Sequence, residues 1–216
     1  MKKILLCIIL LVGVGFIFLK FRHKEYGIDL SHHNKLTNKE WAYLLEKKKV
    51  SFVILKASEG KSFKDPMFNN YYAIAKKYNL KIGAYHFYRD AISPMDQFNN
   101  FQNVVKGKHL DIIPVIDFEP KGFNSTKYSK ADRLENLRLL IKLFENHYKV
   151  NPIIYCSSID YYVSYRELRY LSNLFWINNF KSYLVYNNSH INQYKINLFK
   201  KELDFNEVSN IYKYTL

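Results

Sequence analysis

Residues 81–118 read KIGAYHFYRDAISPMDQFNNFQNVVKGKHLDIIPVIDF and predict a strand, a helix and a second strand in succession. The apolar runs 81–87 and 111–118 are typical of buried strands, although Pro114 argues against full pairing at the centre of the second run. Ser93 begins the helix between them, after which apolar residues recur three and four positions apart. Strands that are joined by such a helix pair in parallel through a right-handed crossover.

The same alternation of strands and helices runs through most of the chain. Helices are expected after Thr37, whose capping box includes Glu40, after Asp65 and after Ser129. Further strands are expected at residues 26–29, 52–55, 152–155, 174–177, 190–194 and 202–205. Such a series forms an open doubly wound sheet or a closed barrel, and no glycine-rich phosphate loop follows the first strand. We therefore expect an α/β fold, an irregular TIM-like barrel in which about five βα units are closed by about three further strands.

The first 24 residues differ from the rest of the chain. Residues 4–19 are apolar or glycine without interruption, with lysines before and after them. As a helix they would span about 24 Å, slightly less than a bilayer core of about 30 Å. We expect residues 1–24 to form an N-terminal apolar helix that is an uncleaved signal anchor, with a cleaved signal peptide as the alternative. Residues 25–216 then form a single extracytoplasmic domain in the cell envelope, anchored to the membrane or secreted.

Charge and composition limit the possible partners. The chain has 33 Lys+Arg against 19 Asp+Glu, and a net charge of +14 favours association with nucleic acid, anionic lipid or an acidic cell-wall polymer. Because the basic residues form no continuous block, we do not expect nucleic-acid binding. The histidines lack ligand spacing and no CxxC or HExxH occurs, so no metal site is expected. A content of 48% hydrophobic and 17% aromatic residues excludes intrinsic disorder.

Polar and aromatic residues gather at the predicted C-terminal ends of the strands, where a parallel barrel builds its site. They are Asp29, Ser31, His32, His33, Lys56, Glu59, Tyr85, Arg89, Asp117, Glu119, Tyr155, Trp176, Asn178, Gln193, Asp204 and Asn206. Tyr85, Tyr155 and Trp176 are candidates for stacking on sugar rings, with plain core packing as the alternative. We expect His86 to be a hydrogen-bonded wall residue, and the histidines at 32–33 to belong to a loop and not to a metal site.

The strongest candidate for chemistry is the sequence Asp117-Phe118-Glu119. Alternate residues of a strand lie on one face about 6 to 7 Å apart, so both carboxylates are expected to share a pocket. Repulsion and partial burial then keep a proton on one of them while the other stays ionised, as acid-catalysed glycoside cleavage requires. A solvated rim or a divalent metal site is the alternative for such a pair. The expected convergence of Asp29 and Asp204 through barrel closure weighs against that alternative.

Four motifs in this order resemble glycoside hydrolase family 25, the N,O-diacetylmuramidase type of lysozyme. They are Tyr26-Gly-Ile-Asp-Leu-Ser-His-His-Asn34, Phe52-Val-Ile-Leu-Lys-Ala-Ser-Glu-Gly60, Ile82-Gly-Ala-Tyr-His-Phe-Tyr-Arg89 with Gln97 and Phe101, and Pro114-Val-Ile-Asp-Phe-Glu119. The resemblance extends from about Tyr26 to Asn206. It implies the irregular barrel described above. It also implies hydrolysis, in peptidoglycan, of the β-1,4 bond between N-acetylmuramic acid and N-acetylglucosamine, without a cofactor.

The resemblance also implies a role for each site residue. Glu119 would be the general acid, and Asp117 would orient the acetamido group of the muramic acid. Asp29 and Asp204 would complete the acidic pocket. The substrate-binding residues would be Tyr85, Tyr155, Trp176, Glu59 and Gln193. The implied partners are peptidoglycan strands and, through the N-terminal segment, a membrane, and we expect a monomer.

The sequence departs from the family pattern near the last strands. Ile191-Asn-Gln-Tyr194 lacks the tryptophan of the usual Trp-Gln-Tyr. Asn178-Asn179 replaces the small residue and the aromatic-rich segment that often follow the tryptophan of the sixth strand. These departures leave a second hypothesis open, in which the chain is a catalytically weak peptidoglycan-binding or scaffolding protein on the same fold.

Overall fold

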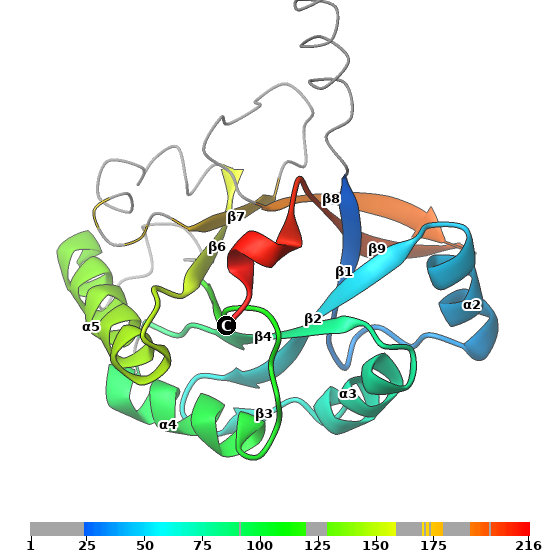
Figure 1. Ribbon diagram of the computed structural model, residues 1–216. Coiled ribbons are helices and arrows are strands. Elements are labelled where there is room, and N and C mark those ends of the chain that lie inside the picture. Colours follow the sequence, from blue (N-terminus) through cyan, green and yellow to red (C-terminus); the bar gives the residue numbers. More distant parts are fainter. Residues whose placement is uncertain are drawn as a thin grey trace, which may run out of the picture.

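The computed structural model describes residues 24–90, 92–119, 129–158, 170, 172, 174–178, 191–198 and 200–216. Its centre is a closed barrel, and Figure 1 shows the C-terminal segment lying across one end of it. The barrel strands are β1 (Glu25–Leu30), β2 (Val50–Glu59), β4 (Lys81–Phe87), β5 (Val115–Asp117), β6 (Ile153–Ser157), β7 (Phe175–Asn178), β8 (Ile191–Leu198) and β9 (Lys201–Val208). The ring of eight strands closes because β1 pairs with both β2 and β9, and β3 (Phe63–Lys64) is a short addition to β2. The predicted barrel is confirmed.

The barrel strands from β1 to β8 run parallel around the ring, whereas β9 runs antiparallel to both of its neighbours. The end at which β1 to β8 finish is called the C-terminal end of the barrel, and the other the N-terminal end. β5 is shorter than the predicted run 111–118. Pro114 has no amide hydrogen, and its carbonyl accepts a hydrogen bond of 3.0 Å from the Ile153 amide immediately before parallel pairing begins.

Four helices cover the outside of the barrel in the described part of the chain, α2 (Asn38–Glu46), α3 (Phe68–Lys77), α4 (Pro94–Val105) and α5 (Lys130–Tyr148) (Figure 1). The predicted caps at Thr37, Ser93 and Ser129 are confirmed, because each side chain accepts a hydrogen bond from the backbone amide three residues later. The predicted N-terminal apolar helix falls on residues 1–23, and the chain after the fifth predicted strand includes residues 159–169; both segments lie outside the described ranges. Among the described residues, no helix combines the length and the apolar composition needed to cross a membrane.

The predicted helix start at Asp65 is wrong. The helix begins at Phe68, and no side chain caps it. One oxygen of the Asp65 carboxylate instead accepts a hydrogen bond of 2.9 Å from the Met67 amide, and the other lies 2.7 Å from His32 Nδ1. Asp65 therefore joins the turn before α3 to the loop after β1.

The hydrophobic core has two layers. One fills the inside of the barrel and includes Phe52, Ile54, Val115, Ile153, Tyr155, Trp176 and Ile191. The other lies between the barrel and the helices and includes Leu44, Phe68, Phe101, Leu137 and Phe144. The short 3-10 helix η1 (Ile211–Tyr214) closes the N-terminal end, where the Ile113 amide donates to the Tyr214 carbonyl at 2.7 Å. A site inside the barrel must therefore open at the C-terminal end.

Candidate active site

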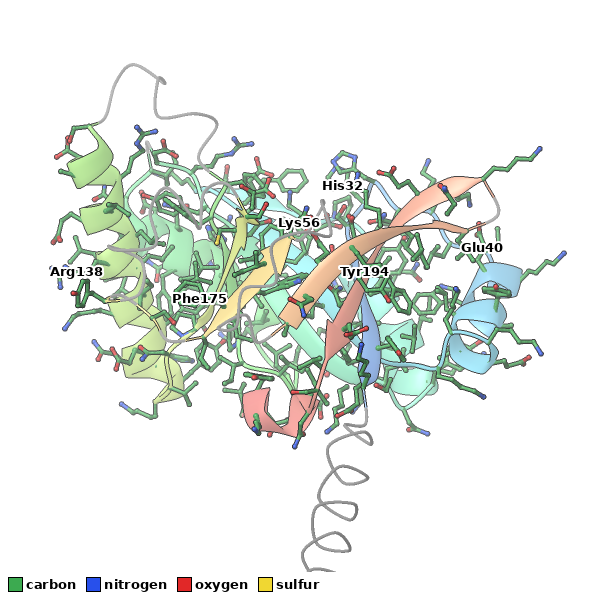
Figure 2. The ribbon with its side chains drawn as sticks, turned by 90° about the horizontal axis from the view of Figure 1, so that it is seen from above. His32, Glu40, Lys56, Arg138, Phe175 and Tyr194 are labelled. Atoms are coloured by element: carbon green, nitrogen blue, oxygen red, sulfur yellow. The ribbon has the colours of Figure 1, made fainter. Side chains whose placement is uncertain are left out.

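A cavity of about 350 Å³ lies at the C-terminal end of the barrel. Its lining residues are Asp29, Ser31, His33, Lys56, Glu59, Tyr85, Phe87, Arg89, Asp117, Glu119, Tyr155, Trp176, Gln193 and Asp204. Figure 2 shows Lys56 and His32 on the side of the molecule opposite η1. All nine residues that the sequence analysis assigned to catalysis or substrate binding are among the lining residues.

Asp117 and Glu119 lie at the end of β5 and line the same cavity. Phe118 between them is buried against the helices, and its amide donates to the Tyr155 carbonyl at 2.9 Å. This fixes the alternation that turns both carboxylates to the cavity side. Asp117 is buried, whereas Glu119 is exposed. Burial raises the pKa of Asp117 well above its usual range, and the charge of Glu119 raises it further while Lys56 opposes the shift.

One oxygen of Asp117 is in an unusual position for a carboxylate. Oδ1 is buried and accepts no hydrogen bond from the described residues. A buried polar atom without a partner is costly, and such atoms are concentrated at functional sites. The atom is therefore suited to accept a hydrogen bond from a ligand in the cavity.

Asp29, in β1, is held by two amide side chains. Its Oδ2 accepts hydrogen bonds from Gln193 Nε2 at 2.9 Å and from Asn206 Nδ2 at 2.8 Å. Burial, followed by the charge of Asp204, raises the pKa of Asp29 to about 7, although both hydrogen bonds act in the opposite direction. Burial also raises the pKa of Asp204. The acidic side of the cavity therefore carries one carboxyl group, that of Asp29, which changes charge near neutral pH.

Asp204 reaches the cavity by an unexpected route. The sequence analysis placed it at the C-terminal end of the last strand, which is wrong because β9 is antiparallel and Asp204 lies in its first half. The strand runs from the C-terminal end of the barrel towards the N-terminal end, so its early residues meet the late residues of β1. Asp204 therefore lies at the predicted end of the barrel, but near the start of its strand and not near the end.

Tyr155 and Trp176 stand behind these amides. The Tyr155 hydroxyl donates to Gln193 Oε1 at 2.8 Å, and Trp176 Nε1 donates to Asn206 Oδ1 at 2.8 Å. Their rings pack edge to face with centroids 4.7 Å apart, and only 7% and 2% of the two residues is exposed. Packing and hydrogen bonding thus account for both rings, which orient the amides that hold Asp29. Asn206 was not among the nine predicted site residues, although its place at a strand end was a signal for it.

Lys56, Glu59 and Arg89 form an ion-paired cluster on the other side of the cavity. Lys56 Nζ lies 2.6 Å from Glu59 Oε2, and Arg89 Nε donates to Glu59 Oε1 at 2.9 Å. Both cations also lie over the Phe87 ring, 4.9 Å and 4.8 Å from its centroid. Burial acts to raise the pKa of Glu59, but the hydrogen bonds from the two cations outweigh it and lower that pKa. Glu59 is therefore an ionised anchor for two cations.

His86 is a buried wall residue, as predicted. Its Nδ1 lies 2.8 Å from Ser58 Oγ and its Nε2 lies 3.1 Å from Gln97 Oε1. Because Gln97 Oε1 also accepts from the Arg89 amide, at 2.8 Å, His86 Nε2 must be the donor and Ser58 must donate to Nδ1. Burial lowers the pKa of His86 to about 4, which keeps the ring neutral.

The histidines at 32–33 belong to the loop after β1, and His32 bonds to Asp65. Within the described ranges, no three or more His, Cys, Asp or Glu side chains are grouped as a metal ion would need. The cavity instead combines five carboxylates with two cations and the amide of Gln193, a set that can move a proton and bind a polar ligand.

Comparison with curated proteins gives partial matches. The chain is 34% identical over 110 residues to an autolytic lysozyme of Clostridium acetobutylicum, covering 47% of this chain and 34% of that protein. It is 25% identical over 143 residues to an uncharacterised protein of Escherichia coli, YegX, covering 64% of this chain and 50% of that protein. The chain thus spans about half the length, or less, of these curated relatives.

Solved structures share the fold over most of the chain. A family 25 glycosyl hydrolase from Bacillus anthracis has a TM-score of 0.74 and 23% sequence identity, over 91% of this chain and 95% of that one. A lysozyme from Streptomyces coelicolor has a TM-score of 0.72 and 22% identity, over 86% of this chain and 92% of that one. The family model "Glycosyl hydrolases family 25" matches residues 28–207. With most of its length matched by that model, the chain belongs to family 25 of the glycosyl hydrolases.

Proposed function

We propose that this protein is a muramidase that hydrolyses the β-1,4 bond between N-acetylmuramic acid and N-acetylglucosamine in peptidoglycan. The observation that carries the proposal is the pair Asp117 and Glu119, two carboxylates of different exposure that line one cavity at the C-terminal end of the barrel. Membership of family 25 supports the reaction class. The match to an autolytic lysozyme supports peptidoglycan as the substrate.

The pair holds one proton in the free enzyme, and Glu119 delivers it. Asp117 has the raised pKa, but its burial keeps it away from a bridging sugar oxygen, whereas Glu119 is exposed at the cavity. An acetamido N–H that donates to Asp117 Oδ1 favours the ionised form of Asp117. Substrate binding thus transfers the proton to Glu119, which protonates the leaving oxygen as general acid.

The same contact orients the substrate. With its N–H on Asp117, the acetamido group of the muramic acid directs its carbonyl oxygen towards the anomeric carbon, where it assists departure of the leaving group. Asp29 and Asp204 lie across the cavity and stabilise the positive charge that develops on the sugar ring. Tyr85, Glu59 and Gln193 line the remaining wall and contact the glycan, with Tyr155 and Trp176 behind it.

The site acts on the extracytoplasmic side of the membrane, because peptidoglycan lies there. The apolar segment 4–19 anchors the chain, and residues 25–216 form one catalytic domain that works as a monomer. One chain supplies every residue in the mechanism above.

A catalytically weak glycan-binding protein is the second candidate. The observation that favours it is Asn192, which stands in β8 where the family pattern has a tryptophan and is half-buried. The same acidic cavity would then hold a glycan without cleaving it.

Digestion of purified peptidoglycan separates the two candidates. The wild type should release new reducing ends, and mass spectrometry should identify N-acetylmuramic acid as the reducing-end sugar of the products. Glu119→Gln should release them about 100-fold or more slowly. Glu135→Gln, which removes the same charge from the exposed face of α5, should keep full activity. Equal activity of wild type and Glu119→Gln would remove Glu119 from the mechanism. Binding without cleavage from about pH 4 to 8 would establish the second candidate.

A further inference from the structure

Lysines gather at the N-terminal end of the barrel, opposite the candidate active site. The parallel strands all begin there and α2 to α5 all end there, so the turns between them share one face. The lysines of these turns, here called the basic face, are Lys24, Lys47, Lys48, Lys49, Lys76, Lys77, Lys81, Lys106, Lys108, Lys149 and Lys213. Most of them are exposed.

Few acidic groups balance the basic face. Those in the same described turns and last helical turns are Glu25, Glu46, Asp111, Glu145, Glu207 and the carboxylate of Leu216. Glu207 is paired with Lys24 at 2.7 Å, and Asp111 lies 3.4 Å from His109 and accepts from the Ile82 amide. The described part of the molecule is therefore polarised, with surplus positive charge at one end and the acidic cavity at the other.

Helix stabilisation explains only part of this pattern. A lysine in the last turn of a helix interacts favourably with the helix dipole, but the effect is confined to that turn. Lys49 and Lys108 each follow the end of their helix by three residues. Lys49 and Lys149 also occupy left-handed backbone positions, with φ of 55° and 63°, which glycine or asparagine adopts more easily. Lysine therefore occupies both positions although its left-handed backbone conformation costs free energy there.

The basic face is hollowed. A cavity of about 610 Å³ lies within it, lined by Gln102, Lys106, Lys108, His109, His147 and Leu216 among others. This cavity is larger than the one at the candidate active site, and its charged lining residues include two lysines. Its size and charge suit a phosphate-bearing headgroup.

The chain approaches the barrel from this same end. β1 begins at Glu25, beside the end of β9, and Figure 2 shows η1 on the side opposite Lys56. In the sequence, residues 20–23 are all that separate Lys24 from the apolar segment 4–19. Four residues span at most about 14 Å, so an anchored segment would hold the basic face near the membrane surface. There a lysine experiences the surface potential of anionic lipid.

We propose that the basic face docks on anionic phospholipid headgroups of the membrane that holds the apolar segment, so that the candidate active site points away from the membrane towards the wall. The proposal rests on the membrane attachment proposed above. It adds a second, electrostatic contact that fixes the orientation of the barrel.

Lysine acylation tests the docking with the full chain in nanodiscs, made either of phosphatidylcholine alone or of phosphatidylcholine and phosphatidylglycerol in equal amounts. Mass spectrometry then measures the rate of acylation at each lysine. Lys48, Lys49, Lys106, Lys108 and Lys149 should react about threefold or more slowly in the anionic discs. Lys35, Lys61 and Lys64, at the C-terminal end, should react equally in both. Salt at about 0.5 M should abolish the difference, because the Debye length falls to about 4 Å.

Two triple variants with the same charge change provide the control. Lys106→Gln/Lys108→Gln/Lys149→Gln should remove the protection of Lys48 and Lys49, whereas Lys35→Gln/Lys61→Gln/Lys64→Gln should keep it. Equal acylation in both discs would overturn the proposal, as would a chain that fails to enter nanodiscs. Protection by a soluble polyglycerol phosphate but not by the discs would also overturn it, and would assign the face to a wall polymer.

Activity on soluble glycan fragments is measured separately on the same samples. The first triple variant should cleave these fragments at the wild-type rate, because its substitutions lie at the opposite end from the cavity of Asp117. Docking without cleavage would refute only the proposed muramidase activity. Cleavage without docking would refute only the role of the basic face.

Discussion

The Asp29 carboxylate shows how a single residue links stability to function. It is partly buried beside Asp204, and two amide hydrogen bonds do not offset the cost of its charge. Its pKa of about 7 lies well above the value of about 4 for an aspartate in an unfolded chain. The folded protein therefore keeps a proton, between about pH 4 and 7, that the unfolded chain has released.

This difference predicts the sign of the pH dependence. The free energy of unfolding should fall as pH rises through about 4 to 7, because the folded state must then give up its extra proton. Asp29→Asn removes the titrating group, and it should be more stable than wild type at about pH 8 by about 2 to 4 kcal/mol while matching it more closely at about pH 5. Urea unfolding at both pH values measures these free energies.

Asp96→Asn, in the first turn of α4, is the control and should keep the pH dependence of the wild type. If Asp29→Asn also had the same pH dependence as the wild type, the prediction would be contradicted.

At the scale of elements, α4 fixes the segment after β4 through one side chain. Gln97 accepts from the Arg89 amide at 2.8 Å and donates to the carbonyls of Arg89 and Ile92, both at 3.0 Å. It also accepts from His86. Arg89 then reaches back to Glu59 at the end of β2. The helix thus sets the position of a cation in the candidate active site without lining the cavity itself.

Replacement of Gln97 by methionine keeps the length of the side chain but removes every one of these hydrogen bonds. Several buried polar groups are then left without partners, and we expect a loss of about 3 kcal/mol or more in the free energy of unfolding. Among the described residues Gln102→Met, on the same helix, loses a single hydrogen bond, of 3.0 Å to the Tyr148 hydroxyl, and should cost less than about 1.5 kcal/mol. Denaturant unfolding compares the two variants, and equal losses would show that the Gln97 contacts are not special.

The elements that the sequence predicted well depend on contacts between residues that are close together along the chain. The caps at Thr37 and Ser129 involve residues three apart, so local sequence determines them. The antiparallel direction of β9 depends instead on pairing with β1, and Asn206 and Asp29 are separated by 177 residues. No local pattern carries that information. The wrong helix start at Asp65 has a similar cause, because the distant His32 binds the carboxylate that would have capped the helix.

At the scale of the whole molecule, the strand-end rule located the candidate site because barrel closure brings every parallel strand to one rim. It placed Asp117 and Glu119 in one cavity, but it did not predict which of them is buried. The sequence also did not predict that Tyr155 and Trp176 support the site from behind, since the type of an aromatic residue does not determine whether it faces a ligand or the core. These properties follow from three-dimensional packing.

Closure itself depends on a glycine. Gly27 in β1 pairs with Phe52 in β2, and a Cβ atom at Gly27 would lie 2.2 Å from the Phe52 ring, which is completely buried inside the barrel. Gly27→Ala should therefore destabilise the fold by about 2 to 3 kcal/mol or more, because one of the two strands must shift. Gly83→Ala, where the new atom would be 3.2 Å from Ile112, should cost less.

A double-mutant cycle tests the cause. If the clash is with the ring, Gly27→Ala combined with Phe52→Leu should be less destabilising than the sum of the two single changes, by about 1 kcal/mol or more. Asp29 lies two residues further along β1, so a displaced strand also moves it away from the amides of Gln193 and Asn206. Hydrolysis of peptidoglycan by Gly27→Ala should fall more than its folded fraction does, and the double variant should regain part of it. Strictly additive unfolding energies would show that the barrel closes at this point without the contact between Gly27 and Phe52.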